Sequence, residues 1–352
     1  MQLKILIIGA GAIGTMLGVS LAEKNEVSFY VRESRSEKLR ESGLSLNLAG
    51  TERRIEKPRL VTSLKKGGDS PYDLAVISVK AYSLDEILAN LDGDLFMDVM
   101  TCQNGIGNEE KIGAAFGMER LVSGVITLPV AVGDGGKVTV TNAKGGISFG
   151  KTSPGDEKAA KAAELFAEAG FRTSVCENYR DMKWSKVLLN MNSNALSSIT
   201  SMTMEDLFRS PEAVRIEKEL FTEALGLLDR EGVKCVDLPG YPVRLMNMMY
   251  RHLPVPLISA VMLLSGKARA RGKKMPSLYI DIEKGSRNSE IDVLNGAVER
   301  LGRDTGVKTP WNSFICGVFH DIMEKRRDRD EYRDNPGKLL EEAIKFVSEA
   351  KG

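Results

Sequence analysis

Residues 3–14, LKILIIGAGAIG, decide how the first half of the chain folds. The isoleucine-rich run 3–8 is typical of a buried parallel strand. A helical pattern with Leu17 and Leu21 on its apolar side follows, and residues 26–31 (EVSFYV) predict a second strand. Between the first strand and the helix lies a match to the spacing GxGxxG, made by Gly9, Ala10, Gly11, Ala12, Ile13 and Gly14. This order is the fingerprint of a dinucleotide-binding β-α-β unit.

Each glycine of this turn has its own physical reason. Gly9 permits a tight turn, Gly11 lets the backbone approach a pyrophosphate, and Gly14 lets the helix pack closely on the strand. The phosphates would then lie on the N–H groups at the start of the helix. An ordinary glycine-rich turn is the alternative, but the strands on both sides favour a nucleotide site. We therefore expect residues 9–14 to bind a dinucleotide.

The end of the second strand bears on which dinucleotide is bound. A site for NAD usually places Asp or Glu there, against the ribose 2′-hydroxyl. Here Arg32 follows the strand, and a guanidinium suits a 2′-phosphate. Two alternatives stay open: Glu33 would bring a carboxylate to the ribose after a shift of one residue, and Arg32 could be a solvated loop residue. Arg32 predicts NADP(H).

Two further strands end in polar residues that suit a ligand site. Residues 72–79 lead to Lys80, and residues 95–100 lead into a loop that contains Asn104. Ligands of open α/β sheets bind beyond the carboxyl ends of the strands. We expect Lys80 to donate to a phosphate or ribose of the cofactor, and Asn104 to contact the nicotinamide and the substrate.

The remainder of this half predicts supporting structure. Glu109 and Glu110 open a helix, with Asn108 in the N-cap position. The β-rich segments between residues 121 and 150 are separated by glycines, and we expect hairpins that complete the sheet. Residues 156–169 predict an amphipathic helix.

The composition is that of a globular protein with a small-molecule partner. The chain has 352 residues, 42% of them hydrophobic and 28% charged, which suggests about two domains. A net charge of +1 gives no pull toward nucleic acid or an anionic membrane. The most apolar run, 253–264, holds two prolines and is shorter than the roughly 20 residues of a membrane span. The chain starts directly with a strand, so no signal peptide is expected.

Cysteine and histidine chemistry is not expected to carry the function. No two of the four cysteines have CxxC spacing, so neither a disulfide framework nor a zinc site is predicted, and a reducing, cytoplasmic compartment fits. The only histidines are His252 and His320, and neither has a recognisable catalytic setting.

From about residue 179 onward the pattern is helical. Lys186, Asn190 and Asn194 are spaced i, i+4 and i+8, which on one helix places an ammonium and two amides on one face. Helix interiors disfavour asparagine, so this alignment indicates a polar site. A solvated helix face is the alternative. The opposite side is apolar, with Trp184 and Leu188 among its residues.

Taken together, these motifs resemble the ketopantoate reductase family over nearly the whole chain. The match consists of six elements in order: Gly9 to Gly14, Val79-Lys80-Ala81, Gln103-Asn104-Gly105, Trp184-x-Lys186-x3-Asn190-x3-Asn194, Pro276-Ser277 and Ser289-Glu290-Ile291-Asp292. Six ordered matches are far more specific than a lone glycine motif.

The resemblance implies an α/β fold class and an activity. The family has an N-terminal Rossmann-type dinucleotide-binding domain, here 1–177, and a C-terminal all-helical domain, here 178–352. It implies NADPH-dependent reduction of 2-dehydropantoate to (R)-pantoate, on the way to pantothenate and coenzyme A. The implied partner is a small 2-oxo acid, with no metal, no nucleic acid and no integral membrane segment. A homodimer stays open.

The resemblance also implies roles for single residues. Lys186 would be the general acid, and Glu290 would bind a substrate hydroxyl and orient Lys186. Asn190 and Asn194 would bind substrate hydroxyls, and Ser277 the substrate carboxylate. Asn104 would hold the substrate near the nicotinamide. The cofactor-binding set would comprise Gly9, Ala10, Gly11, Ala12, Ile13, Gly14, Arg32, Lys80, Asn104 and Glu290.

Two departures and three alternatives accompany this interpretation. The spacing from Ser277 to Glu290 is one residue longer than the family pattern, at Gly285-Ser286-Arg287, which puts the role of Ser277 in doubt. The segment 235–274 is also longer than its counterpart in compact family members. It could cover the substrate pocket, contact a second copy of the chain or contact a membrane surface. The alternatives are a reductase of another 2-oxo acid, a non-catalytic NADP-binding regulatory protein, and a flavin-binding oxidase.

Overall fold

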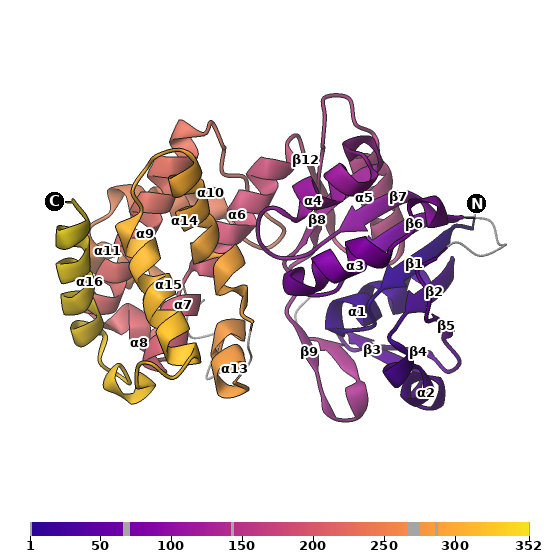
Figure 1. Cartoon of the computed structure of the whole chain (residues 1–352), viewed down its shortest axis with the longest axis horizontal. Coiled ribbons are helices and arrows are strands. Elements are labelled where there is room, and N and C mark those ends of the chain that lie inside the picture. The colour runs from indigo at the N-terminus through magenta and orange to yellow at the C-terminus, as the bar shows by residue number, and fades with distance from the viewer. Residues whose placement is uncertain (1, 66–70, 142–143, 266–274, 286–287, 352) are drawn as a thin grey trace. The chain divides into compact units, whose positions relative to one another are not determined.

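The computed structural model describes residues 2–65, 71–141, 144–265, 275–285 and 288–351. The chain forms two compact units (Figure 1). Unit 1 comprises Met1–Lys183 and Val236–Tyr241, and unit 2 comprises Trp184–Cys235 and Pro242–Gly352. The division between Lys183 and Trp184 falls inside helix α6 (Tyr179–Met191), six residues after the boundary expected from the sequence.

Unit 1 is built on a sheet of eight strands in the order β12-β11-β8-β7-β6-β1-β2-β5. All neighbours pair in parallel except β8 and β11, which are antiparallel. This is the parallel α/β sheet that the sequence predicts. The strands are β1 (Lys4–Ile8), β2 (Glu26–Tyr30), β5 (Arg59–Val61), β6 (Tyr72–Ile77), β7 (Phe96–Thr101), β8 (Leu121–Ile126), β11 (Ile147–Gly150) and β12 (Thr173–Cys176).

Strand β1 shows why this sequence gives a buried central strand. Its side chains alternate between the two faces, so Ile5 and Ile7 join one apolar core and Leu6 and Ile8 the other. All four are fully buried. A run of apolar residues without alternation is what a sheet covered on both faces requires.

Helices cover both faces of this sheet (Figure 1). Helices α1 (Ala12–Leu21) and α5 (Lys158–Glu168) contribute to the core on one face, and α3 (Leu84–Asn90) and α4 (Asn108–Phe116) to the core on the other. Helix α2 (Glu33–Ser42) follows β2. The amphipathic helix expected at 156–169 is confirmed as α5.

A second, four-stranded sheet packs on helix α1, and the sequence analysis missed it. Its order is β4-β3-β10-β9, with the bounds β3 (Leu44–Leu48), β4 (Thr51–Ile55), β9 (Val130–Val132) and β10 (Val138–Val140). The expectation that all hairpins between 121 and 150 complete one sheet is therefore wrong for β9 and β10. Leu44, Leu46 and Val138 are buried in the core that also contains α1, so the second sheet covers the outer side of that helix.

One short segment of the second half belongs to unit 1. In Val236–Tyr241 the chain makes a tight turn, with an isolated bridge between Leu238 and Tyr241. The hydroxyl of Thr127 donates to the carbonyl oxygen of Pro239 at 2.8 Å. A side chain at Gly240 would lie 2.4 Å from the carbonyl oxygen of Lys144, so only glycine fits this approach. We call this segment the strap.

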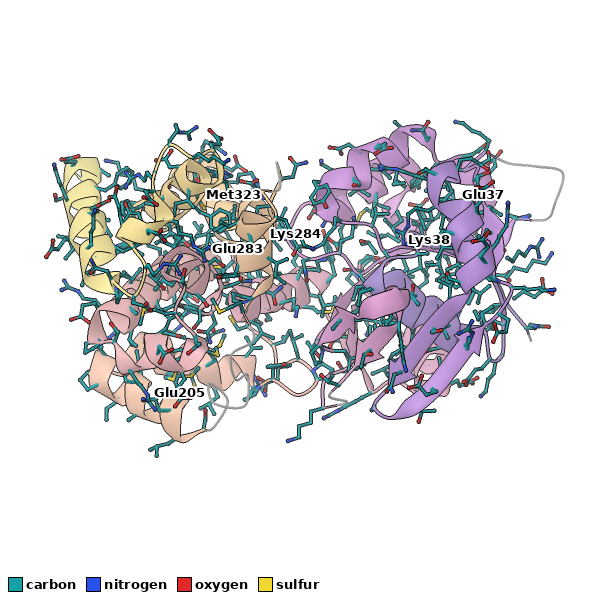
Figure 2. The ribbon with its side chains drawn as sticks, turned by 90° about the horizontal axis from the view of Figure 1, so that it is seen from below. Glu37, Lys38, Glu205, Glu283, Lys284 and Met323 are labelled. Carbon is teal, nitrogen blue, oxygen red and sulfur yellow. The ribbon has the colours of Figure 1, made fainter. Side chains whose placement is uncertain are left out.

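Unit 2 is all-helical, as predicted. The long helix α9 (Pro211–Arg230) lies in its core and packs against α8, α10, α11, α14, α15 and α16. Figure 2 labels residues at the C-terminal ends of α13 (Glu283) and α15 (Met323). The helices are α6 (Tyr179–Met191), α7 (Asn194–Thr200), α8 (Met204–Arg209), α9 (Pro211–Arg230), α10 (Val243–His252), α11 (Val255–Leu264), α13 (Ser277–Glu283), α14 (Asn295–Asp304), α15 (Pro310–Met323) and α16 (Pro336–Lys351).

The single helix predicted through Lys186, Asn190 and Asn194 is wrong in one respect. Helix α6 ends at Met191, and Asn194 begins a separate helix, α7. Between them Ser193 adopts a left-handed conformation with φ of 63°. Lys186 and Asn190 still follow each other by one turn of α6, but Asn194 does not continue that face.

Candidate active site

Four predicted cofactor residues or motifs follow adjacent parallel strands of unit 1. The glycine turn at 9–14 follows β1, Arg32 follows β2, Lys80 follows β6 and Asn104 follows β7. These strands are neighbours in the order β7-β6-β1-β2, so their carboxyl ends lie at the same edge of the sheet. The structure therefore brings these predicted residues to one edge, where open α/β sheets bind ligands.

The glycine turn has the shape that a dinucleotide requires. Gly9 has φ of 105°, and a Cβ on Gly14 would lie 1.8 Å from the carbonyl oxygen of Gly9, so helix α1 can start this close to β1 only with glycine there. A Cβ on Gly11 would meet no atom within 4 Å, which leaves space beside the N-terminus of α1. The first-turn N–H groups of a helix attract phosphate. These features fit a pyrophosphate.

Arg32 is exposed and pairs with a carboxylate in this structure. Its Nη2 lies 2.7 Å from Oε2 of Glu86, which belongs to α3. Both side chains are about two-thirds exposed, at 66% and 59%. An exposed ion pair of this kind contributes only about 0–1 kcal/mol. A 2′-phosphate would therefore displace only a weak ionic partner when it binds the guanidinium.

The turns that carry Lys80 and Asn104 are tied together by hydrogen bonds. The side-chain amide of Gln103 donates to the carbonyl oxygen of Val79 at 2.9 Å. The amide of Asn108 donates to the carbonyl oxygen of Asn104 at 3.1 Å. Asn108 is the first residue of α4 and Gly107 occupies its N-cap, so the predicted N-cap at Asn108 is wrong by one position.

A buried ion pair lies behind the Asn104 loop. Nζ of Lys183 is 2.9 Å from Oε1 of Glu109, and the two side chains are 2% and 1% exposed. Lys183 also donates to the carbonyl oxygen of Gln103 at 2.6 Å, and Ser123 donates to Glu109 at 2.9 Å. We call Gln103, Glu109, Ser123 and Lys183 the buried network. Burial also raises the pKa of the neighbouring Cys102 thiol to about 12, despite the nearby Lys183.

In unit 2, the predicted lysine and asparagines lie on two consecutive helices. Lys186 and Asn190 are partly buried on α6, and Asn194 is buried at the start of α7. The amide oxygen of Asn194 has no hydrogen-bond partner among the described residues. A buried acceptor without a partner is unfavourable unless a ligand or water supplies a donor. Asn194 therefore suits a hydroxyl-bearing ligand.

The break between α6 and α7 is held by a buried carboxyl group on α9. Oε1 of Glu217 accepts the backbone N–H of Ser193 at 3.0 Å, and Glu217 is 2% exposed. Its other oxygen has no hydrogen-bond partner among the described residues. Burial raises the pKa of Glu217 to about 8, and the hydrogen bond from Ser193 offsets this only in part.

The two remaining predicted residues lie on separate elements of unit 2. Ser277 is exposed at the first position of α13, a helix that packs against α7. Glu290 is buried and starts a 3₁₀ turn, Glu290–Val293, that packs against α14 and α15. The preceding Ser289 donates to Asp281 on α13 at 3.1 Å. Ser286 and Arg287, at the extra position in this spacing, lie outside the described residues, as does the basic stretch 267–274.

Sequence reasoning missed the buried network and Glu217. The sequence predicted Glu109 only as a residue at the start of a helix, and it predicted no role for Lys183. A usable signal existed, because Lys183 lies on the side of α6 that otherwise carries apolar residues such as Val187. Within the described residues, no group of three or more His, Cys, Asp or Glu could hold a metal, and no helix meets the length and apolarity needed to cross a bilayer.

The fold and the glycine turn define a class, that of nicotinamide-dependent oxidoreductases with a Rossmann-type unit and a helical unit. Two family models match the chain: "Ketopantoate reductase PanE/ApbA" over residues 5–154 and "Ketopantoate reductase PanE/ApbA C terminal" over residues 178–323. The chain belongs to the ketopantoate reductase family and is an oxidoreductase.

Relatives and solved structures agree with this assignment. The chain is 28% identical to the 2-dehydropantoate 2-reductase of Pyrococcus horikoshii, over 90% of this chain and 96% of the relative. It is 26% identical to the enzyme of that name from Lactococcus lactis, over 92% and 98%. A D-mandelate dehydrogenase solved with NADH has 25% identity and a TM-score of 0.74, over 92% of this chain and 99% of that one.

Proposed function

We propose that this protein reduces 2-dehydropantoate to (R)-pantoate with NADPH. The observation that carries the proposal is the presence of Lys186, Asn190 and Asn194 in the segment that matches the C-terminal family model. The relatives that match over most of their length bear the name 2-dehydropantoate 2-reductase. The proposed activity would make it a biosynthetic enzyme of the pantothenate and coenzyme A route.

The glycine turn would bind the pyrophosphate of the dinucleotide, and Lys80 and Asn104 its further parts. The bound nicotinamide supplies hydride to the carbonyl carbon of the substrate. The protein must then handle the negative charge that develops on the carbonyl oxygen. Lys186 carries an ammonium that can stabilise this oxyanion and donate a proton to it. Lys186 is therefore proposed as the general acid.

Other polar residues of unit 2 would bind and orient the substrate. Asn194 offers a buried amide oxygen without a partner among the described residues, which suits a substrate hydroxyl. Asn190, one turn after Lys186, would donate or accept beside it. Glu290 would accept a substrate hydroxyl and orient Lys186. Ser277 would contact the substrate carboxylate.

Preference for NADPH is part of the proposal and depends on Arg32. A guanidinium binds a phosphate through charge-assisted hydrogen bonds, which are roughly twice as strong as neutral ones. The exposed Glu86 offers Arg32 a weak competing partner. The NADH in the mandelate dehydrogenase structure shows that a similar fold accepts the unphosphorylated cofactor, so cofactor preference needs its own measurement.

A second candidate function is the reduction of a different 2-oxo acid. The D-mandelate dehydrogenase structures support it, because their similarity to this chain at 25% identity is close to that of the reductases. Such an enzyme would keep the same general acid and the same cofactor fold. Only the groups around the substrate side chain would differ.

The test is a substrate and cofactor panel with the purified protein. Oxidation of NADPH and NADH is followed with 2-dehydropantoate, pyruvate, 2-oxoisovalerate and phenylglyoxylate. We expect rapid turnover selective for NADPH and 2-dehydropantoate. Turnover selective for another 2-oxo acid would move the substrate and keep the mechanism. Binding of NADPH without turnover of any substrate would favour a regulatory protein.

We further propose that the enzyme works in the cytoplasm, where NADPH is supplied and thiols stay reduced. The structure has its four cysteines as free thiols. A homodimer is a further proposal for this chain. Light scattering measures it: a dimer has twice the 38.5 kDa mass of the chain, and a monomer has that mass.

A further inference from the structure

The buried network touches both turns that carry proposed cofactor residues. At one end, Gln103 donates to the carbonyl oxygen of Val79, the residue before Lys80. At the other, Lys183 donates to the carbonyl oxygen of Gln103, the residue before Asn104. The Gln103 side chain thus binds the backbone before Lys80, and the Lys183 side chain binds the backbone before Asn104. Lys80 and Asn104 themselves do not belong to the network.

The network is enclosed and satisfied by partners within unit 1. Glu109 accepts from Ser123 on β8 at 2.9 Å and pairs with Lys183 on α6. The side-chain oxygen of Gln103 accepts from Thr101, at the end of β7, at 3.1 Å. The four side chains of the network and that of Thr101 are each at most 5% exposed. Four elements thus meet at one buried point behind the Asn104 loop.

Stability alone is a weak reason for a buried ion pair. Removing two charges from water carries a large desolvation penalty, and apolar replacements of similar volume are often as stable or more stable. What an ion pair offers that apolar groups do not is direction, because Lys183 must point at two specific oxygens, those of Glu109 and Gln103. The geometry thus favours a role in fixing one loop conformation.

We propose that the Lys183–Glu109 pair, acting through Gln103, positions Lys80 and Asn104 for the nicotinamide half of the cofactor. Lys183 and Glu109 are positioning residues and touch neither cofactor nor substrate. This inference rests on the proposed nicotinamide-dependent function. It predicts that the network affects binding of the nicotinamide half and leaves binding at the glycine turn unchanged.

The test compares two ligands that differ in the nicotinamide half of the cofactor. The full chain is titrated with NADPH and with 2′-phospho-AMP, which keeps the adenosine, its 5′-phosphate and the 2′-phosphate but lacks the nicotinamide, its ribose and the second phosphate. The variant is Lys183→Met/Glu109→Gln, which removes both charges and keeps the side-chain volumes. We expect its Kd for NADPH to rise about 3- to 10-fold, the effect of losing one or two hydrogen bonds, while its Kd for the fragment stays unchanged.

A second variant avoids the charged pair. Gln103→Met breaks the bond to the carbonyl oxygen of Val79 and leaves Lys183 and Glu109 in place. We expect the same selective loss of NADPH affinity, and a fall in kcat of up to about 10²-fold, as small displacements near a reaction can produce. The matched control is Lys151→Met, which removes an exposed pair with Glu177 in the same unit and should change neither ligand's affinity.

Three outcomes are distinguishable. A selective loss for NADPH in both variants supports the proposal. Equal loss for NADPH and the fragment, or no loss for either in a variant with wild-type circular dichroism, overturns it. Because the readout is binding, it does not depend on which 2-oxo acid is the substrate. If wild-type protein binds neither NADPH nor NADH, the proposed function itself fails, which is a separate result.

Discussion

Each unit buries a glutamate behind a proposed site residue, and the two units compensate that burial differently. In unit 1, Glu109 pairs with Lys183 at 2.9 Å and accepts from Ser123. In unit 2, Glu217 accepts one backbone N–H, from Ser193, and its second oxygen has no hydrogen-bond partner among the described residues. Glu217 binds the backbone of Ser193, the residue before Asn194, directly. Glu109 acts through Lys183, which donates to the carbonyl oxygen of Gln103, the residue before Asn104.

The difference teaches how a buried carboxyl group is accommodated. A carboxylate in a medium of low dielectric constant needs a counter-charge, or else it keeps its proton. Lys183 supplies the counter-charge for Glu109. For Glu217, burial raises the pKa to about 8, so it is mainly protonated at neutral pH. One anchor is therefore ionic, and the other is a neutral acid that titrates near physiological pH.

The largest expected effect is a loss of kcat on a change in unit 2 that leaves cofactor binding by unit 1 intact. Lys186→Ala in unit 2 should lower kcat by about 10²- to 10⁴-fold, the usual contribution of a positioned general acid. Affinity for NADPH should stay nearly unchanged, because the proposed cofactor turns belong to unit 1. Steady-state kinetics and a fluorescence titration with NADPH check this, and a near-normal kcat would refute the role of Lys186.

The next effect is on the free energy of unfolding, when the counter-charge of Glu109 is removed. Lys183→Met alone leaves Glu109 buried without its cation. Breaking a buried pair in this way typically lowers the free energy of unfolding by about 3–5 kcal/mol. Urea denaturation measures it, with Lys151→Met as the control for an exposed pair. A loss below about 1 kcal/mol, the range of exposed pairs, would show that the burial of this pair has little energetic weight.

The neutral anchor should make stability depend on pH. Between the unperturbed pKa of 4.5 and the raised value of about 8, the unfolded chain releases a proton that folded Glu217 keeps. The free energy of unfolding therefore falls as pH rises through this window, by at most about 1.4 kcal/mol per pH unit from this group.

Glu217→Gln isolates this contribution. The amide has nearly the same shape and does not titrate, so the variant should lack the part of the pH dependence that Glu217 causes. We expect the variant to gain stability relative to wild type as pH is raised from 4.5 to about 8, the window between the pKa of Glu217 in the unfolded chain and its pKa in the folded protein. Identical pH profiles for the two proteins would contradict the raised pKa.

A smaller effect is expected at the exposed pair of unit 1. Arg32→Ala should weaken NADPH more than NADH by about 10- to 100-fold, because a hydrogen bond to a charged group contributes about 1.5–3 kcal/mol. Glu86→Gln, which removes the competing carboxylate, should leave the preference for NADPH intact. An equal loss for both cofactors in Arg32→Ala would assign the preference to another residue.

The smallest effect concerns the left-handed residue that Glu217 holds. Ser193 has φ of 63°, a conformation that glycine adopts without strain. Comparing Ser193→Gly with Ser193→Ala removes the hydroxyl in both, so the difference reports the backbone alone. We expect the glycine variant to be more stable by about 0.5–1 kcal/mol. Thermal unfolding measures this, and a more stable alanine variant would contradict it.

Local sequence signals predicted much of unit 1. The first strand, glycine turn, helix and second strand are confirmed because each depends on neighbouring residues: an apolar run, glycines at fixed spacing and a helical period. The strands β3 and β4 were not predicted. In LSLNL three leucines alternate with polar residues, which is a strand pattern but only five residues long, and TERRI is mainly polar and becomes a strand by pairing with it across a tight turn.

The rest depends on partners far away in the sequence. The period of Lys186, Asn190 and Asn194 predicts one helix, but Glu217 binds the N–H of Ser193 from 24 residues away and stabilises the break. Lys183 and Glu109 lie far apart in the chain, and a lysine near a helix start normally indicates a solvated surface. The helical period places Lys183 on the apolar side of α6, but no local pattern identifies Glu109 as its buried partner.

The strap has a consequence for how the protein is made. Unit 1 is not complete when the ribosome has passed Lys183, because the strap at Val236–Tyr241 comes only after residues 184–235 have been synthesised. Synthesis proceeds at about 5–20 residues per second, so several seconds pass between the synthesis of Lys183 and that of the strap, whose Pro239 carbonyl oxygen accepts from Thr127. During that interval the Thr127 hydroxyl lacks its Pro239 partner, and a chain that stops at Lys183 never gains it.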